Sequence, residues 1–68
     1  MKPLKITTPY ITLQQLLKIE EIISSGGEAK FYLAENPVLV NGELENRRGR
    51  KLYQKDVIKV DNQEFLIE

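Results

Sequence analysis

A run of cations near the middle of the chain carries the side chains best suited to bind phosphate. No acidic residue interrupts this run, which consists of Arg47, Arg48, Arg50, Lys51 and Lys55. The planar guanidinium of arginine can donate two parallel hydrogen bonds to one phosphate, and it stays charged at any working pH. Gly49 adds a hinge that would let the run follow a curved phosphate backbone. The alternative is a solvated surface loop whose charges only keep the protein in solution.

A second candidate phosphate site lies at the start of a predicted helix. Ser25, Gly26 and Gly27 precede this helix, and amides at a helix N-terminus carry partial positive charge that can hold a phosphate. The glycines would allow a close approach, and Lys30 in the first turn would extend the positive patch. In the alternative, the glycines only supply the turn and Ser25 occupies the amides as a helix cap.

Of the three tyrosines, one is a candidate for stacking on a nucleic-acid base. Tyr32 falls on a predicted apolar helix stripe and is expected in the core. Tyr53 directly follows the cationic run, so it is the tyrosine that we consider for stacking.

No set of residues indicates catalysis. The chain has no cysteine and no histidine, which removes the thiol nucleophile, the thiolate zinc site and the usual general base. Glu43 and Glu45 lie two apart on a predicted strand, where paired carboxylates commonly form a solvated face. We therefore expect a protein that is not an enzyme and that has no cofactor and no metal.

Composition indicates one small globular domain over residues 1–68. Hydrophobic residues make up 41% and charged residues 29%, and no apolar run approaches the roughly 20 residues that span a bilayer. Because no apolar stretch follows Met1, we expect no signal peptide and a cytoplasmic location. Ten basic and ten acidic residues cancel, so the cationic run belongs to a dipolar molecule of zero net charge.

The N-terminal half predicts two short helices after a possible edge strand at residues 2–6. Thr12 and Gln15 have capping-box spacing, so a first helix should begin at Leu13. Continuing it would place Glu20 on the apolar face, so it should end near residues 19–21, with Ile22 and Ile23 packing inward from a turn. Ser25 and Glu28 have the same spacing, which predicts a second helix over residues 27–34. That helix should end at Asn36-Pro37, because the residue before a proline resists helical geometry.

The C-terminal half predicts strands with turns between them. Residues 38–40, 43–45, 57–60 and 64–67 have strand character, and Asn41-Gly42 is typical of a tight hairpin. The order predicts an α+β fold, with two short helices packed on a small, mostly antiparallel sheet. We expect most of the core to come from Leu13, Leu16, Leu17, Ala29, Leu33, Leu39, Val57 and Ile58.

Several of these segments together resemble the RNA-binding domain named after the fourth small-subunit ribosomal protein, the S-four or αL domain. The matching stretches are Ser25-Gly-Gly-Glu-Ala-Lys30, Val38-Leu-Val-Asn-Gly-Glu43, Arg47-Arg-Gly-Arg-Lys-Leu52 and Asp56-Val57. The resemblance covers about residues 12–60 and is strongest to stand-alone bacterial members of the YaaA and YbcJ kind. Family members commonly have an arginine and a serine where this chain has Gly26 and Gly27.

The resemblance implies a module that grips the phosphate backbone of a structured RNA, with ribosomal RNA as the expected partner. It also implies a role in ribosome assembly or translation, with RNA contacts at the cationic run and at the start of the second helix. The sequence does not identify the oligomeric state, and we expect a monomer. One alternative is a ubiquitin-like sulfur carrier of the β-grasp fold, although such a carrier needs a C-terminal Gly-Gly and this chain ends Leu66-Ile67-Glu68. Another alternative is an adaptor whose basic patch binds an acidic protein.

Overall fold

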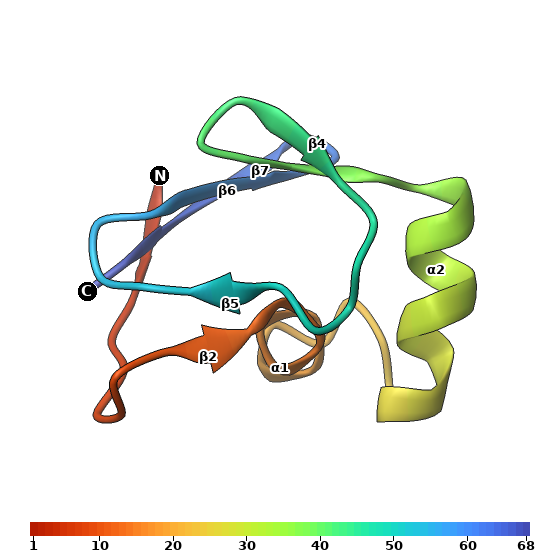
Figure 1. Cartoon of the computed structure of the whole chain (residues 1–68), viewed down its shortest axis with the longest axis horizontal. Coiled ribbons are helices and arrows are strands. Elements are labelled where there is room, and N and C mark those ends of the chain that lie inside the picture. The colour runs from red at the N-terminus through yellow and green to blue at the C-terminus, as the bar shows by residue number, and fades with distance from the viewer.

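The computed structural model describes residues 1–68, with two short helices and two β-sheets (Figure 1). The elements in chain order are β1 (Lys2–Leu4), β2 (Ile11–Thr12), α1 (Leu13–Ile19), the 3₁₀ turn η1 (Gly26–Glu28), α2 (Ala29–Glu35), β3 (Val38–Val40), β4 (Glu43–Glu45), β5 (Lys51–Leu52), β6 (Val57–Val60) and β7 (Gln63–Ile67). None of the helices combines the length and the apolar character that a membrane crossing requires.

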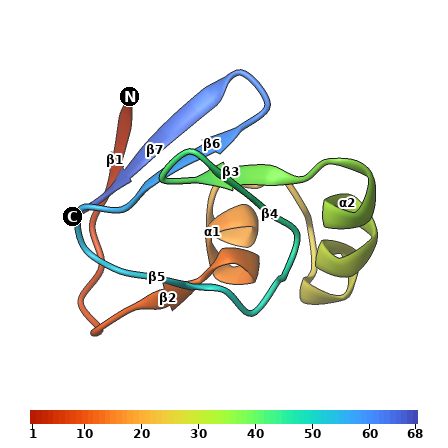
Figure 2. The ribbon, with the colours of Figure 1, turned by 45° about the horizontal axis from the view of Figure 1, so that its top comes forward.

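The larger sheet has five strands in the order β1-β7-β6-β3-β4. Every pairing in it is antiparallel except that of β1 with β7, which confirms the predicted mostly antiparallel α+β fold. The smaller sheet pairs β2 with β5, and α1 continues directly from β2 and lies beside this sheet (Figures 1 and 2). Helix α2 stands beside them at the β3–β4 end of the larger sheet.

Helix α1 begins where the sequence predicts. The Thr12 hydroxyl accepts a hydrogen bond from the Gln15 amide at 3.2 Å, and the Gln15 side chain accepts one from the Thr12 amide at 2.8 Å. The helix ends at Ile19, and Glu21 then adopts a left-handed conformation with φ of 59°. This turn directs Ile23 into the core, as the break in the apolar pattern predicted.

The second helix begins differently from the prediction, because a 3₁₀ turn precedes it. The Glu28 amide donates to the Ser25 carbonyl at 3.1 Å, so it is not available to the Ser25 hydroxyl. The predicted capping box of Ser25 and Glu28 is therefore wrong, and the Ser25 side chain makes no cap. Ser24 instead donates its hydroxyl proton to the Glu28 carboxylate at 2.7 Å.

Two turns in the C-terminal half confirm local sequence signals. Asn41 and Gly42 both have positive φ, at 52° and 84°, as expected of a two-residue hairpin between β3 and β4. Asp61, with φ of 56°, turns the chain from β6 into β7. Strand β7 begins at Gln63, one residue earlier than predicted.

The core differs from the prediction at the strands. Leu39 and Val57 are only half-buried, because Val38 and Val40 face inward on β3 and Ile58 and Val60 do so on β6. Tyr32 is also half-buried rather than part of the core. Buried side chains that were not predicted are Ile11, Val38, Val40, Leu52, Val60, Phe65 and Ile67.

Ile11 and Leu52 anchor the smaller sheet to this core. They are cross-strand partners in the β2–β5 pair, and both are buried. Each strand has only two residues, so two hydrophobic side chains hold a sheet that has little backbone pairing of its own. The position of β5, and of the cations next to it, therefore depends on this contact.

We expect Leu52→Ala to lower the free energy of unfolding by about 2–5 kcal/mol, because it removes fully buried methyl groups and leaves a cavity. The matched control is Leu44→Ala, the same change at a side chain that is 76% exposed, which should alter stability by at most about 0.5 kcal/mol. Urea unfolding followed by circular dichroism measures both. Equal effects of the two substitutions would contradict the anchoring role of Leu52.

A candidate nucleic-acid interface

The segment between β4 and β5, together with the first residue of β5, is here called the basic loop (residues 46–51). Its backbone is turned toward α1. The Leu13 amide donates to the Arg50 carbonyl and the Gln14 amide donates to the Arg48 carbonyl, both at 2.9 Å. These are two of the amides that a helix start leaves without intrahelical partners. The first turn of α1 therefore fixes the loop backbone, while the side chains of Arg47 and Arg48 stay exposed.

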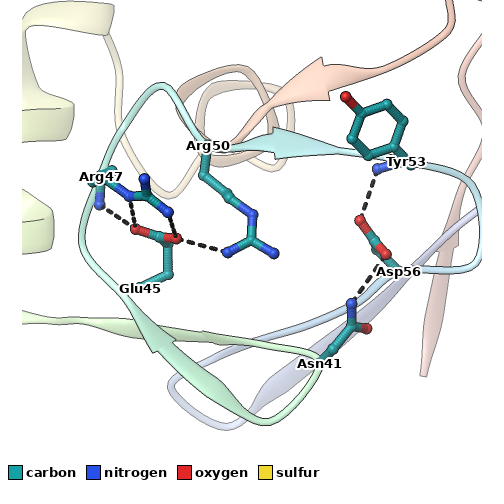
Figure 3. A network of polar contacts seen from close by, with 6 residues as sticks. All are labelled: Asn41, Glu45, Arg47, Arg50, Tyr53 and Asp56. Carbon is teal, nitrogen blue, oxygen red and sulfur yellow. Dashed lines mark hydrogen bonds and ion pairs between the residues drawn. The ribbon is translucent and has the colours of Figure 1, made fainter.

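Glu45 fixes the loop from the other end, and its observed position differs from the predicted one. This carboxylate was expected on a solvated strand face, but the residue is only 5% exposed. It accepts hydrogen bonds from the Arg47 backbone amide, from Nε and Nη2 of Arg47, and from Nη1 of Arg50, at 2.8–2.9 Å (Figure 3). Leu44 is instead turned outward, because adjacent side chains of a strand alternate between its two faces and Glu45 is turned inward.

The electrostatic effect of this arrangement is large for Glu45. The side-chain hydrogen bonds from Arg47, helped by its backbone amide and by Arg50, lower the pKa of the Glu45 carboxyl from 4.5 to about 2 against the opposing effect of burial. Glu45 is therefore ionised throughout the neutral range. Residues 47–51 contain four cations and no acid, so together with the Glu45 carboxylate they keep three net positive charges.

The four cations differ in how much hydrogen-bonding capacity they keep. Arg48 and Lys51 take part in no ion pair, and both are exposed. Arg47 donates hydrogen bonds from Nε and from one Nη2 proton to Glu45, yet its side chain is 73% exposed and its other N–H groups stay free. Arg50 is more enclosed and gives Glu45 a single contact.

A cavity of about 380 Å³ opens on this surface. Its lining consists of Arg47, Gly49, Arg50, Lys51 and Tyr53. Three of these side chains are cationic and none is acidic, so the cavity suits an anion such as a phosphate. Gly49 borders open space, because a Cβ there would meet no other atom within 4 Å.

Gln14 connects the second predicted contact region, around Gly26, to the basic loop. The Gln14 backbone is bonded to Arg48, while its side chain lies so close to Gly26 that a Cβ there would fall 2.6 Å from Nε2. The structure thus brings the residues around Gly26 and the basic loop to the same end of α1. Ser25 and Gly27 are exposed beside it, and Lys30 is exposed on the first turn of α2.

A second carboxylate positions the residues that follow β5. Asp56 accepts hydrogen bonds from the Tyr53 amide at 2.8 Å and from the Asn41 side-chain amide at 3.0 Å (Figure 3). Asn41 in turn accepts one from the Val57 amide at 2.8 Å. The hairpin turn after β3 is thereby tied to the turn that carries Tyr53. No group of three or more histidine, cysteine, aspartate or glutamate side chains is placed to hold a metal ion.

Two of these positioning residues were missed by sequence reasoning. For Glu45, the signal was available in part, since a carboxylate two residues before Arg47 and five before Arg50 can reach both. For Asn41, no local signal indicates a bond to Asp56, which lies fifteen residues away.

Glu45→Gln should lower the free energy of unfolding at neutral pH by about 1–3 kcal/mol, because it weakens the charge-assisted hydrogen bonds of two arginines. Since the folded-state pKa of Glu45 lies below its ordinary value, the stabilising contribution is complete above about pH 4.5 and is lost as the pH falls toward 2. The difference between wild type and variant should therefore shrink over that range. Thermal midpoints measured across the range test this.

Glu43→Gln is the matched control, because it removes the same charge from an exposed position on the same strand. Its stability should follow that of the wild type at every pH. A constant gap between wild type and Glu45→Gln from neutral pH down to about 2 would contradict the assigned role of the carboxylate.

Comparison with known proteins identifies the family. The family model described as the S4 domain matches residues 4–68. The chain is also 54% identical over 59 residues to a Bacillus subtilis (strain 168) protein named "Probable ribosome maturation protein RlbA", a match that covers 87% of this chain and 83% of the relative. Nearly the whole chain matches the model, and the relative is itself a small protein of similar length. The chain therefore belongs to the S4 domain family.

Proposed function

We propose that residues 1–68 form one S4-type module that binds the phosphate backbone of a folded RNA and takes part in ribosome maturation in the cytoplasm. The proposed partner is ribosomal RNA, and the proposed mode of action is binding without catalysis, by a monomer. The name of the Bacillus subtilis relative supports the ribosomal role. Membership of the S4 domain family supports RNA as the partner.

The observation that carries this proposal is the basic loop on its fixed support. Its four cations and the neighbouring Glu45 leave a net charge of +3 in one segment of a protein whose total charge is zero. The Arg48 and Arg50 carbonyls are fixed by α1, and Arg47 and Arg50 are fixed by Glu45. Because the loop backbone and two of the four cationic side chains are held in place before binding, RNA would lose less of its interaction energy to ordering the loop.

Within this proposal the cations divide into two roles. Arg48 and Lys51 have no protein partner among the acids, so they contact phosphates with their full charge. Arg47 and Arg50 contribute the N–H groups that Glu45 leaves free, at fixed angles around the 380 Å³ cavity. A rigid array of this kind fits the spacing of phosphates on a folded RNA, which is recognised by shape more than by sequence.

The region around Gly26 would supply further contacts. Ser25 does not cap the helix with its side chain, so its hydroxyl is available to a phosphate, and Gly27 is exposed beside it. Gly26 lies against Gln14, which is itself bonded to the basic loop. Lys30 would extend the positive surface along α2.

The salt dependence of binding should reveal the phosphate contacts. With about three contacts and a slope of about 0.7–0.9 for each, log affinity should fall with log salt at a slope of about −2 to −3. This amounts to about a 20- to 40-fold loss between about 50 and 200 mM salt. Fluorescence anisotropy with a labelled ribosomal RNA fragment measures it. An RNA affinity that does not respond to salt would contradict the proposed phosphate contacts of the basic loop.

Arg48→Gln with Lys51→Gln should weaken RNA binding by at least about 100-fold, because two charge-assisted phosphate contacts are lost. The slope of the salt dependence should also become shallower by about 1.5. We choose these two residues because neither is bonded to Glu45, so the loop keeps its shape.

The matched control is Lys5→Gln with Lys59→Gln, which changes the net charge equally. Lys5 follows β1 and Lys59 lies on β6, so both exposed lysines belong to the larger sheet and its edge. Affinity and slope should stay near the wild-type values in this control. Equal losses in both double variants would mean that RNA responds only to total charge, and the site assignment would then be wrong.

A further inference from the structure

The smaller sheet presents two tyrosines on its exposed face. Ile11 pairs with Leu52 and Thr12 pairs with Lys51, so an antiparallel register places Tyr10 opposite Tyr53 as the next pair. Side chains alternate between the two faces of a strand. Because Ile11 and Leu52 face the core, the flanking residues Tyr10, Lys51 and Tyr53 face outward.

The two rings are in contact, and each keeps a large exposed surface. Their centroids are 5.8 Å apart with an interplanar angle of 50°, a tilted arrangement within the preferred range for aromatic pairs. The exposed fractions are 38% for Tyr10 and 47% for Tyr53. The Lys51 ammonium lies 4.9 Å from the centroid of the Tyr10 ring, over its face. Tyr10 is thus engaged by Lys51 and by Tyr53, and Tyr53 has the freer ring.

Backbone hydrogen bonds hold both tyrosines in place. The Tyr53 amide donates to Asp56, and its ring points away from that carboxylate (Figure 3). The Thr8 hydroxyl donates to the Tyr10 carbonyl at 2.7 Å. A ring that is already positioned loses little conformational entropy when a flat ligand stacks on it.

The tyrosine pair adjoins the cavity of the basic loop. Tyr53 and Lys51 line that cavity together with Arg47 and Arg50. A phosphate bound there would place the base of the same or the next nucleotide beside the Tyr53 ring. In a continuous duplex the faces of the bases are covered by their neighbours, so only an unpaired base could stack on this ring.

We propose that Tyr53, positioned by Tyr10, stacks on one unpaired RNA base next to the phosphate held in the basic cavity. This inference rests on the proposed function and narrows it. The preferred RNA is then a helix interrupted by an unpaired nucleotide, rather than an uninterrupted duplex. Tyr53 contacts the base, and Tyr10 with Lys51 supports the ring from the side.

Three RNA probes separate stacking from phosphate binding. The first is a stem with one unpaired nucleotide, the second is the same stem with an abasic residue at that position, and the third is the fully paired stem. The first two contain the same phosphates, so a preference between them measures the base alone. The wild type should bind the first probe about 5- to 150-fold more tightly than the second, as expected for one stacked base.

Two substitutions of Tyr53 test whether its aromatic ring causes the preference for the unpaired base over the abasic residue. Tyr53→Leu should abolish the difference between the first two probes, while its affinity for the paired stem and its salt slope stay unchanged. Tyr53→Phe should keep the difference, because the aromatic face remains. The matched control is Phe31→Leu, which removes an aromatic side chain that is 74% exposed on α2, and it should behave as the wild type. Thermal midpoints are measured for every variant.

The possible failures are distinguishable. If the wild type binds all three probes equally and with steep salt dependence, the proposed function stands and the stacking site is wrong. If Tyr53→Leu weakens binding to all three probes alike together with a lowered midpoint, the pair only stabilises the β2–β5 ladder, and the inference is wrong as well. If no probe binds the wild type, both proposals fail.

Discussion

The geometry of the basic loop depends on the hydrogen bonds that the buried Glu45 carboxylate accepts. A buried charge is costly unless it is paired and hydrogen-bonded, and here four N–H groups from Arg47 and Arg50 satisfy it. The low pKa of this carboxyl shows that the pairing outweighs the cost of burial. The same bonds fix two arginines of a segment that would otherwise have only its backbone contacts with α1. The Glu45 carboxylate therefore offsets one of the four positive charges and fixes the side chains of Arg47 and Arg50.

The support of the site is assembled from parts of the chain that are far apart. Thr12 belongs to β2, pairs with Lys51 and also caps α1, so one residue joins the N-terminal segment, the helix and the loop. The first amides of α1 bind the loop carbonyls, which satisfies both the helix start and the loop backbone. Ile11 and Leu52 then attach this assembly to the core. A small protein with a thin core can in this way keep a loop rigid without a disulfide or a metal.

Zero net charge and phosphate binding are compatible because the charges are separated. Four cations gather at residues 47–51, whereas most acids lie outside this segment. The field near the loop is therefore positive although the molecule is neutral, and a polyanion would be steered toward that side. The aromatic pair next to the same cavity adds a surface that charge alone does not provide. Together they would let one small face respond to both the backbone and the bases of an RNA.

The sequence by itself determined the elements whose signals are local. The Thr12–Gln15 spacing located the start of α1, Asn41-Gly42 located a hairpin, and the change to a two-residue period located the strands, because each depends on neighbouring residues only. The cationic run was likewise visible in the order of residues. Only the tertiary structure decided the inward face of β4, the β2–β5 pairing and the meeting of Tyr10 with Tyr53. Alternation shows that Glu43 and Glu45 share a face but not which face is inward, and strands of two residues have no period, so these features follow from contacts between residues distant in the chain.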